Sequence, residues 1–206
     1  MAAKKFFLLA GATATGKSAV AQLLAEKTGL PILSADSMLV YKGMDIGTAK
    51  PTIAERGDVP YFGLDLVTPA ENFSAGAWAQ ASRKTIEKTD APGFIVVGGT
   101  GLYFKALTDG FDFVKSDAAR RGYWQRRLEE DGLAALQQEL RRMSPATVDR
   151  LGDDMLNPRR VIRALEIVES GEARGDAYAP ALGSPVYVLR RNREELHRRI
   201  ALRVRA

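Results

Sequence analysis

The chain has 206 residues, of which 46% are hydrophobic and 27% charged, a composition typical of a globular protein, and its net charge is +5. It contains no cysteine, which excludes disulfide bonds and thiolate metal sites. No window has the apolar length of a membrane span and no signal peptide precedes the first predicted strand. We therefore expect a cytoplasmic protein.

The first predicted strand, Lys4–Ala10, leads into a glycine-rich segment and then an amphipathic stretch, Ala19–Lys27. This segment has the spacing of a phosphate-binding P-loop between a strand and a helix. Its glycines let backbone N–H groups point inward at a polyphosphate, and the following helix adds donors at its N-terminus. Lys17 can reach the phosphates and Ser18 can hold Mg²⁺. The predicted phosphate-binding residues are Gly11, Ala12, Thr13, Ala14, Thr15, Gly16, Lys17 and Ser18.

Short apolar strands then alternate with helical segments as far as about residue 110. Ser74 is a predicted N-cap for a helix that continues through Ile86. This alternation predicts an α/β fold with a P-loop NTPase-like, three-layer parallel sheet. The further strands expected in this part are Pro31–Ser34, Pro60–Leu66 and Phe94–Val97.

Asp36 follows the second predicted strand directly. The ends of neighbouring parallel strands converge, so Asp36 should lie near the P-loop. A carboxylate there could act as a general base. It could equally cap the short segment Met38–Tyr41.

The strand Phe94–Val97 ends in Gly98-Gly-Thr-Gly101 and carries no carboxylate at its end. P-loop kinases and ATPases usually place an aspartate there to help hold Mg²⁺, so its absence weighs against ordinary ATP hydrolysis. The glycines would let a second backbone loop approach a ligand at this edge of the sheet. The alternative is a tight turn from strand to helix.

After Gly110 the pattern becomes helical, which predicts a helical insert on the α/β domain. The expected helices are Arg120–Glu130, Leu133–Met143, Pro145–Leu151 and Pro158–Ser170, followed by a loop over 171–184, a strand at Pro185–Arg190 and a helix at Glu194–Arg205. The predicted domains are 1–112 (core), 113–184 (insert) and 185–206 (return to the core). The last helix ends without a cap, so we expect a further C-terminal part.

Charge is distributed unevenly along the chain. Residues 1–114 carry 11 basic and 11 acidic residues, whereas residues 115–206 carry 19 basic and 14 acidic ones. The basic residues of the second half are almost all arginine, which pairs with phosphates and stacks on bases. This pattern suggests a half that meets nucleic acid. An arginine-biased composition with solvated helix faces would produce it too.

Asn157 and Pro158 are typical of a helix start, yet Arg159, Arg160 and Arg163 follow them at once. Positive charge near a helix N-terminus is unfavourable by roughly 0.3–1 kcal/mol per residue. The cluster therefore suggests an anionic partner, either RNA phosphate or diphosphate. Carboxylate pairing within the insert is the alternative.

Taken in order, these motifs resemble the bacterial tRNA dimethylallyltransferases, and the resemblance covers essentially the whole chain. The shared segments are Gly11–Ser18, Ser34–Pro51, Val59–Asp65, Val97–Leu107 and Asn157–Glu166. The segment from Asp36 to Pro51 is the most specific of them.

The resemblance implies transfer of a dimethylallyl group from dimethylallyl diphosphate to N6 of the adenine beside the anticodon of a tRNA. The P-loop would bind the diphosphate with Lys17 and with Mg²⁺ at Ser18, and Asp36 would be the general base. Thr100 would contact the target nucleotide and Arg193 would lie near the diphosphate. The tRNA-contacting residues implied are Asp36, Ser37, Met38, Leu39, Thr100, Arg121, Arg159, Arg160, Val161, Ile162 and Arg163. The insert would clamp the anticodon arm, and we expect a monomer without a membrane partner.

Three other functions stay open at this point. A small P-loop kinase is disfavoured by the missing strand-end aspartate. An enzyme that prenylates free adenine nucleotides would have little use for the arginine-rich insert. A non-catalytic tRNA-binding protein would keep the fold and bind RNA without transfer.

Overall fold

The computed structural model describes residues 4–110, 117–171 and 184–205. It divides the chain into two compact units, one made of residues 1–111 and 179–206 and the other of residues 112–178. The predicted domain boundaries at 112/113 and 184/185 stay predictions, and most of the predicted loop over 171–184 lies outside the described residues. Among the described residues, no helix has the length and apolar character needed to cross a membrane.

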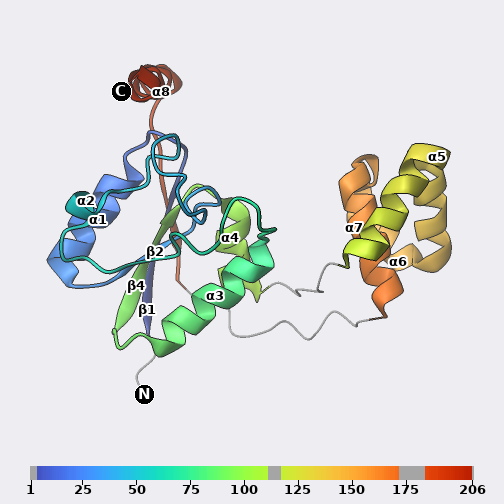
Figure 1. The fold of residues 1–206 in the computed structure, drawn as a ribbon, viewed down its shortest axis with the longest axis horizontal. Helices are drawn as coiled ribbons and strands as arrows, with labels where there is room; N and C mark the ends of the chain where they lie inside the picture. Colours follow the sequence, from blue (N-terminus) through green and yellow to red (C-terminus); the bar gives the residue numbers. More distant parts are fainter. Residues whose placement is uncertain (1–3, 111–116, 172–183, 206) are drawn as a thin grey trace. The chain divides into compact units, whose positions relative to one another are not determined.

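The first unit is an α/β structure (Figure 1). Its parallel sheet has five strands in the order β3-β2-β4-β1-β5. This confirms the predicted α/β fold class. The strands are β1 (Lys5–Gly11), β2 (Ile32–Ser34), β3 (Tyr61–Phe62), β4 (Gly93–Gly98) and β5 (Val186–Leu189). The helices are α1 (Lys17–Thr28), α2 (Ile53–Arg56), α3 (Ala75–Lys88), α4 (Gly101–Lys105), the π-helical segment η1 (Ala106–Gly110) and α8 (Arg193–Arg205).

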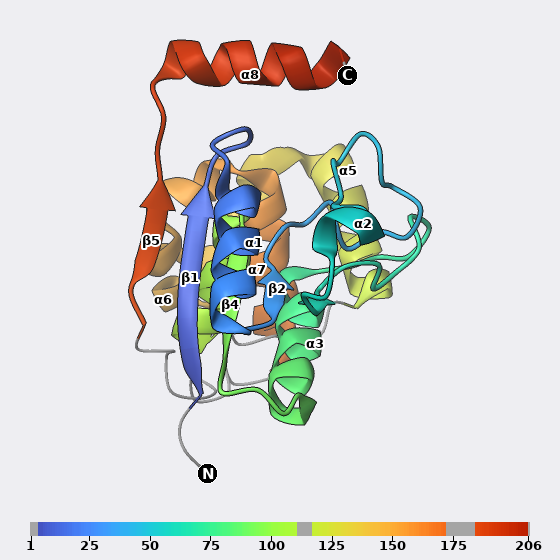
Figure 2. The same ribbon diagram turned by 90° about the vertical axis from the view of Figure 1, so that its left-hand side faces the viewer.

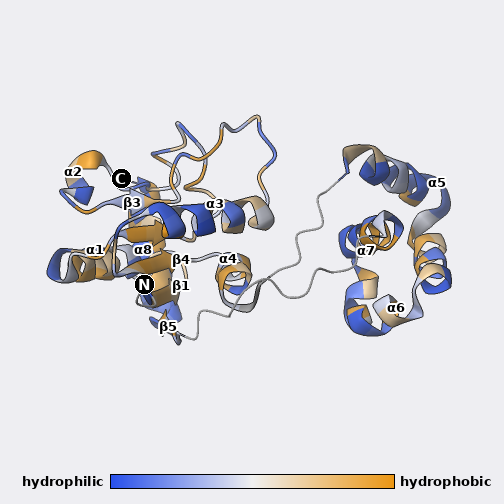
Figure 3. Cartoon of the chain, turned by 90° about the horizontal axis from the view of Figure 1, so that it is seen from below, coloured by the Kyte–Doolittle hydropathy of each residue, from blue (hydrophilic) through white to orange (hydrophobic). Residues whose placement is uncertain are grey.

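Alternate residues of β1 enter two separate apolar cores because successive side chains of a strand point to opposite faces. Leu8 packs with Val96 and Trp78 on the face covered by α3 and α4. Leu9 packs with Ala21 of α1 on the other face. All six residues of β4 are buried, as expected of a strand covered on both sides. Figure 3 shows hydrophilic residues along much of α3, whereas α1 also exposes the apolar residues Val20 and Leu23.

Three local predictions are confirmed and one is corrected. Ser74 caps α3 by accepting a hydrogen bond from the Ala77 N–H, at 3.2 Å. The predicted strand Pro60–Leu66 is reduced to two residues, because the chain turns at Gly63 (φ +79°) and Asp65 (φ +53°). The strand predicted at Pro185–Arg190 forms as β5, parallel to β1 and on its outer side. The helix predicted at Glu194–Arg205 forms as α8.

The second unit contains α5 (Ala118–Met143), α6 (Pro145–Leu151), the 3₁₀ segment η2 (Gly152–Leu156) and α7 (Pro158–Ser170). Gly132 (φ +77°, ψ 171°) interrupts α5, so two helical stretches flank it as predicted. Trp124, Leu136, Leu140 and Leu165 form the buried core of this unit. These helices present their apolar faces to one another, which gives the unit a core of its own.

Candidate functional site

The segment Gly11–Ser18 runs from the last residue of β1 through a tightly curled loop into the first turn of α1. Gly16 precedes α1 with φ +96°, and Ala14 adopts φ +65°, which a non-glycine residue rarely does. The buried Thr15 hydroxyl donates a hydrogen bond to the Ala12 carbonyl at 2.8 Å. A Cβ on Gly11 would lie 2.9 Å from Thr15 Oγ1 and 3.0 Å from the Leu189 carbonyl oxygen. The loop therefore has the conformation of an anion-binding nest at a helix N-terminus.

Lys17 is the cation of this loop. Its ammonium donates to the Ala12 carbonyl at 3.4 Å. Burial lowers the pKa of Lys17, and the Asp36 carboxylate opposes that shift while Arg203 adds to it. A polyanion bound in the loop would stabilise the charged ammonium further.

Asp36 follows β2 and lies at the same edge of the sheet as the P-loop. Its Oδ1 accepts a hydrogen bond from the Met38 N–H at 3.0 Å. The residues after it form turns and not a helix, so Asp36 stabilises a turn and is not a helix cap. Asp36 lines the same cavity as Lys17, and the hydrogen bond from Met38 occupies only Oδ1, which leaves the second carboxylate oxygen for another partner.

Thr100 connects the end of β4 to the segment that carries Asp36. Its hydroxyl oxygen accepts from the Ser37 N–H at 3.0 Å, and its own N–H donates to the Ala35 carbonyl at 3.2 Å. The structure thus brings Thr100, Ser37 and Asp36 together. Beneath them the Trp78 indole N–H donates to the Ser34 carbonyl at 3.0 Å and fixes the end of β2.

A cavity of about 640 Å³ opens between the P-loop and the segment that follows β2. Its wall combines the P-loop and α1 residues with Asp36, the exposed Met38, and a loop at residues 43–49. The lining residues are Thr13, Lys17, Ser18, Asp36, Met38, Leu39, Gly43, Met44, Asp45, Ile46, Gly47, Thr48, Ala49 and Arg203.

A buried lysine holds the 43–49 loop in place. The Lys50 ammonium pairs with Asp45 at 2.6 Å and Asp65 at 2.5 Å and donates to the Tyr41 carbonyl at 2.7 Å. Burial alone would lower the pKa of Lys50, but the hydrogen bonds and charges of the two aspartates outweigh it, so the pKa is raised. Lys50 therefore stays charged and anchors this wall of the cavity.

The arginines that reach this site come from the last part of the chain. Arg191 Nε–H donates to the Thr15 carbonyl, Arg199 Nε–H to the Ala14 carbonyl, and Arg203 to the Thr48 carbonyl, each at 2.8 Å. Figure 2 shows α8 lying over the loop that follows β1. Within the described residues, Arg193 is exposed at the start of α8 and does not line the cavity, whereas Arg203 does. The sequence signal for these contacts is the four-residue spacing of Arg199 and Arg203 on one helix face.

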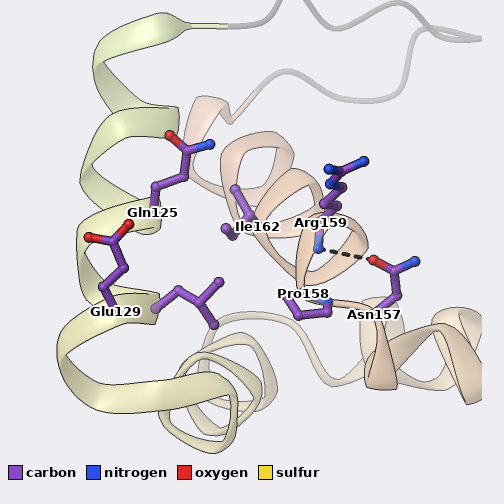
Figure 4. Close-up of a pocket in the computed structure, with 7 residues that line it drawn as sticks. Gln125, Glu129, Asn157, Pro158, Arg159 and Ile162 are labelled. Carbon is purple, nitrogen blue, oxygen red and sulfur yellow. Dashed lines mark hydrogen bonds between the residues drawn. The ribbon is translucent and has the colours of Figure 1, made fainter.

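In the second unit, Asn157 caps α7 as predicted and Pro158 begins it. The Asn157 side chain accepts from the Arg159 N–H at 3.1 Å. Figure 4 shows these residues opposite Gln125 and Glu129 of α5, around a hollow of about 650 Å³. The Arg159 side chain is exposed at this hollow.

Carboxylates within the same unit pair with the other arginines. Arg160 forms an ion pair with Asp154. The buried Glu166 accepts from Arg121 at 2.7 and 3.2 Å and from Arg163 at 2.8 Å. The alternative of pairing inside the insert therefore applies to Arg160 and Arg163 of the arginine cluster, and Arg121 is paired as well. Their side chains nevertheless remain partly exposed.

Val161 and Ile162 lie in the core of the second unit, with 0% and 6% of their surface exposed. Their side chains thus hold α7 against α5. The exposed residues at the start of α7 are Arg159 and Arg160.

Replacing Glu166 with alanine is expected to destabilise the second unit by about 2–3 kcal/mol, because Arg121 and Arg163 lose their shared carboxylate. The loss is below that of a fully buried pair because 45% of the Arg121 side chain is exposed. Urea unfolding followed by the fluorescence of Trp124, in a Trp78→Phe background, would measure it. Glu139→Ala, which removes an exposed partner of Arg142, is the control and should change little. Equal unfolding curves for both variants would contradict the prediction.

The amino-acid sequence matches known protein families over nearly its whole length. A family model described as IPP transferase matches residues 39–206, and one described as isopentenyl transferase matches residues 4–60. The chain is 41% identical to a tRNA dimethylallyltransferase of Pelotomaculum thermopropionicum, with 96% of the chain and 65% of that relative aligned. It is 39% identical to one of Bordetella pertussis, with 98% of the chain and 68% of the relative aligned. The chain thus spans about two thirds of the length of these relatives.

Solved structures that resemble this chain include enzymes of the same kind. A tRNA isopentenylpyrophosphate transferase from Bacillus halodurans has a TM-score of 0.59 and 32% identity, covering 98% of this chain and 65% of that one. A eukaryotic dimethylallyltransferase acting on tRNA has a TM-score of 0.76 and 25% identity, covering 98% of this chain and 52% of that one.

Proposed function

Because this chain belongs to the IPP transferase family, we propose that it transfers a dimethylallyl group from dimethylallyl diphosphate to N6 of the adenine beside the anticodon of a tRNA. The observation that carries the proposal is that Lys17, Ser18 and Asp36 line one cavity. A phosphate-binding loop and a carboxylate that share a cavity can serve the leaving group and the nucleophile of the same reaction. A cytoplasmic site of action is part of the proposal.

In the proposed step, a bond forms between adenine N6 and C1 of the allyl group while the bond from C1 to the diphosphate oxygen breaks. The electron pair leaves with the diphosphate, and the N6 proton passes to the Asp36 carboxylate. The P-loop N–H groups and the Lys17 ammonium would stabilise the charge that develops on the leaving group. Thr100, hydrogen-bonded to Ser37, is our candidate for a contact with the target nucleotide.

Mg²⁺ is proposed to accompany the diphosphate. The Ser18 hydroxyl lines the cavity and offers an oxygen donor of the kind that Mg²⁺ prefers. The described residues contain no group of three or more His, Cys, Asp or Glu that could hold a metal alone. This suits an ion that takes most of its ligands from the diphosphate and water. When bound, the ion would neutralise charge on the departing diphosphate.

The arginine-bearing second unit is the proposed partner for tRNA. Exposed arginine side chains at the start of α7, beside the hollow, are suited to phosphate contacts. The target adenine has to leave its base stack to meet the allylic carbon, as base-modifying enzymes generally require.

One transfer assay tests the proposal against its alternatives. The protein is incubated with labelled dimethylallyl diphosphate, Mg²⁺ and either an anticodon stem-loop RNA or AMP. Label that enters the stem-loop alone supports the proposal. Label in AMP would favour a nucleotide prenyltransferase, and RNA binding without transfer would favour a binding protein. Phosphoryl transfer from ATP to a small molecule would favour a kinase.

Replacing Arg159 with alanine is expected to weaken stem-loop binding and to lower the slope of log K against log salt by about 0.7–0.9, as for one lost phosphate contact. Arg160→Ala should have a smaller effect, because Arg160 is already paired with Asp154. Fluorescence anisotropy at several salt concentrations measures both slopes. The control is Arg141→Ala, at the exposed end of α5. An unchanged slope for the Arg159 variant would assign that residue a structural role.

A further inference from the structure

Two consecutive carbonyl groups of the P-loop accept hydrogen bonds from arginines far away in the sequence. The Thr15 carbonyl accepts from Arg191 and the Ala14 carbonyl from Arg199, both at 2.8 Å. In an anion-binding nest, successive backbone N–H groups point into a concavity that holds the anion. The two guanidinium groups therefore bind carbonyl groups of the same segment whose N–H groups would face a phosphate.

The backbone at this place is under strain. Ala14 has φ +65°, a conformation that costs energy for a residue with a Cβ. Such a conformation persists only where its surroundings enforce it. The hydrogen bond from Arg199 to the Ala14 carbonyl is one such constraint, and the neighbouring bond from Arg191 is a second.

Arg191 is itself held in position. Its guanidinium pairs with Glu195, one helical turn further along. The Glu195 N–H in turn donates to the Asn192 side chain at 2.8 Å. About a third of the Arg191 side chain is exposed, and its Nη2 lies 3.8 Å from where a Cβ on Gly16 would be. The Arg191 guanidinium thus contacts the P-loop while Glu195, in the first turn of α8, holds it in position.

The helix that supplies these groups has no buried residue over its length, Arg193–Arg205. Glu195, Arg199 and Arg203 recur every four residues and therefore lie on one face of α8. This face contacts the P-loop at one end and the Thr48 carbonyl of the 43–49 loop at the other. Both loops line the cavity.

From this geometry we propose that Arg191 and Arg199 are positioning residues, which hold the P-loop in its phosphate-binding conformation before the ligand arrives. The inference rests on the proposed function, because it concerns the same diphosphate site. A different reading is that these arginines only add positive charge near an anion. The two readings make opposite predictions for Glu195, which lies beside Arg191 and carries a negative charge.

The test is calorimetric binding of inorganic pyrophosphate with Mg²⁺ to the full chain, which requires neither RNA nor transfer. Arg191→Ala and Arg199→Ala should each weaken binding by roughly 10-fold, the lower end of the range for a hydrogen bond from a charged group. Arg198→Ala removes the same charge from the exposed part of α8 and should stay within about 2-fold of wild type.

The Glu195→Ala variant distinguishes a positioning role of the arginines from a purely electrostatic one. It removes a negative charge near the anion site, so the charge reading predicts tighter pyrophosphate binding. Positioning predicts weaker binding, by roughly 3-fold, because Arg191 loses its partner. Amide NMR signals of Ala14 to Lys17 in the ligand-free protein should shift in the Arg191 and Glu195 variants and not in Arg198→Ala.

Tighter binding by Glu195→Ala, or wild-type affinity in Arg191→Ala and Arg199→Ala, would overturn the inference and leave the proposed function standing. A wild-type protein that fails to bind pyrophosphate would overturn the diphosphate site itself and the inference with it.

Discussion

Replacing Asp36 with alanine is expected to lower the rate of dimethylallyl transfer by about 10²–10⁴-fold, the usual contribution of a positioned general base. The carboxylate lines the cavity with Lys17 and follows the buried strand β2. Stem-loop binding should be nearly unchanged, because the arginines of the second unit are untouched. Single-turnover transfer and RNA anisotropy measure the two effects separately.

The alanine variant alone is ambiguous, since Asp36 also accepts a hydrogen bond from the Met38 N–H. Asp36→Asn is the matched control, because an asparagine oxygen can still accept that bond but the amide cannot take the proton. We expect the asparagine variant to be as slow as the alanine variant. Recovery of most of the transfer rate in Asp36→Asn would mean that the turn, and not the base, is what the reaction needs.

Gly98→Ala is expected to destabilise the first unit by about 3 kcal/mol, the upper end of the usual cost of overpacking, because the added methyl group would collide with the backbone. A Cβ on Gly98 would lie 2.0 Å from the Ala35 carbonyl oxygen, and both residues belong to central strands or their immediate ends. Relief would require β2 and β4 to separate, which would displace the adjacent Asp36. Thermal and urea unfolding would measure the loss.

Gly101→Ala is the control for this substitution, since nothing lies within 4 Å of a Cβ at that position. It begins α4, where alanine suits the helix better than glycine. We expect equal or slightly higher stability. A Gly98 variant that unfolds like the Gly101 variant would show that the strand ends can adjust.

Local patterns account for the parts of the fold that could be predicted. The P-loop, the N-caps Ser74 and Asn157, and the break near Gly132 each depend on residues within a few positions of one another. The short helix α2 was missed although Thr52 and Glu55 form a capping box, with Glu55 accepting from the Thr52 N–H at 2.7 Å. That signal was present in the sequence.

Long-range contacts account for what could not be predicted. The ion pairs of Lys50 with Asp45 and Asp65 depend on how two turns fold together, and nothing in the spacing indicates them. The resemblance pointed to Arg193 as the arginine near the diphosphate, whereas Arg191 and Arg199 are the ones that contact the P-loop.

The place of β5 in the sheet has a consequence for how the protein is made. β1 pairs with β4 on one side and with β5 on the other, so the outer edge of β1 stays unpaired until residues 186–189 have been synthesised. The helices of residues 117–171 pack on one another, so they can fold on the ribosome before residues 186–189 have been synthesised. The first strand to emerge is therefore among the last to be completed, and the nascent chain must protect an open edge during that interval.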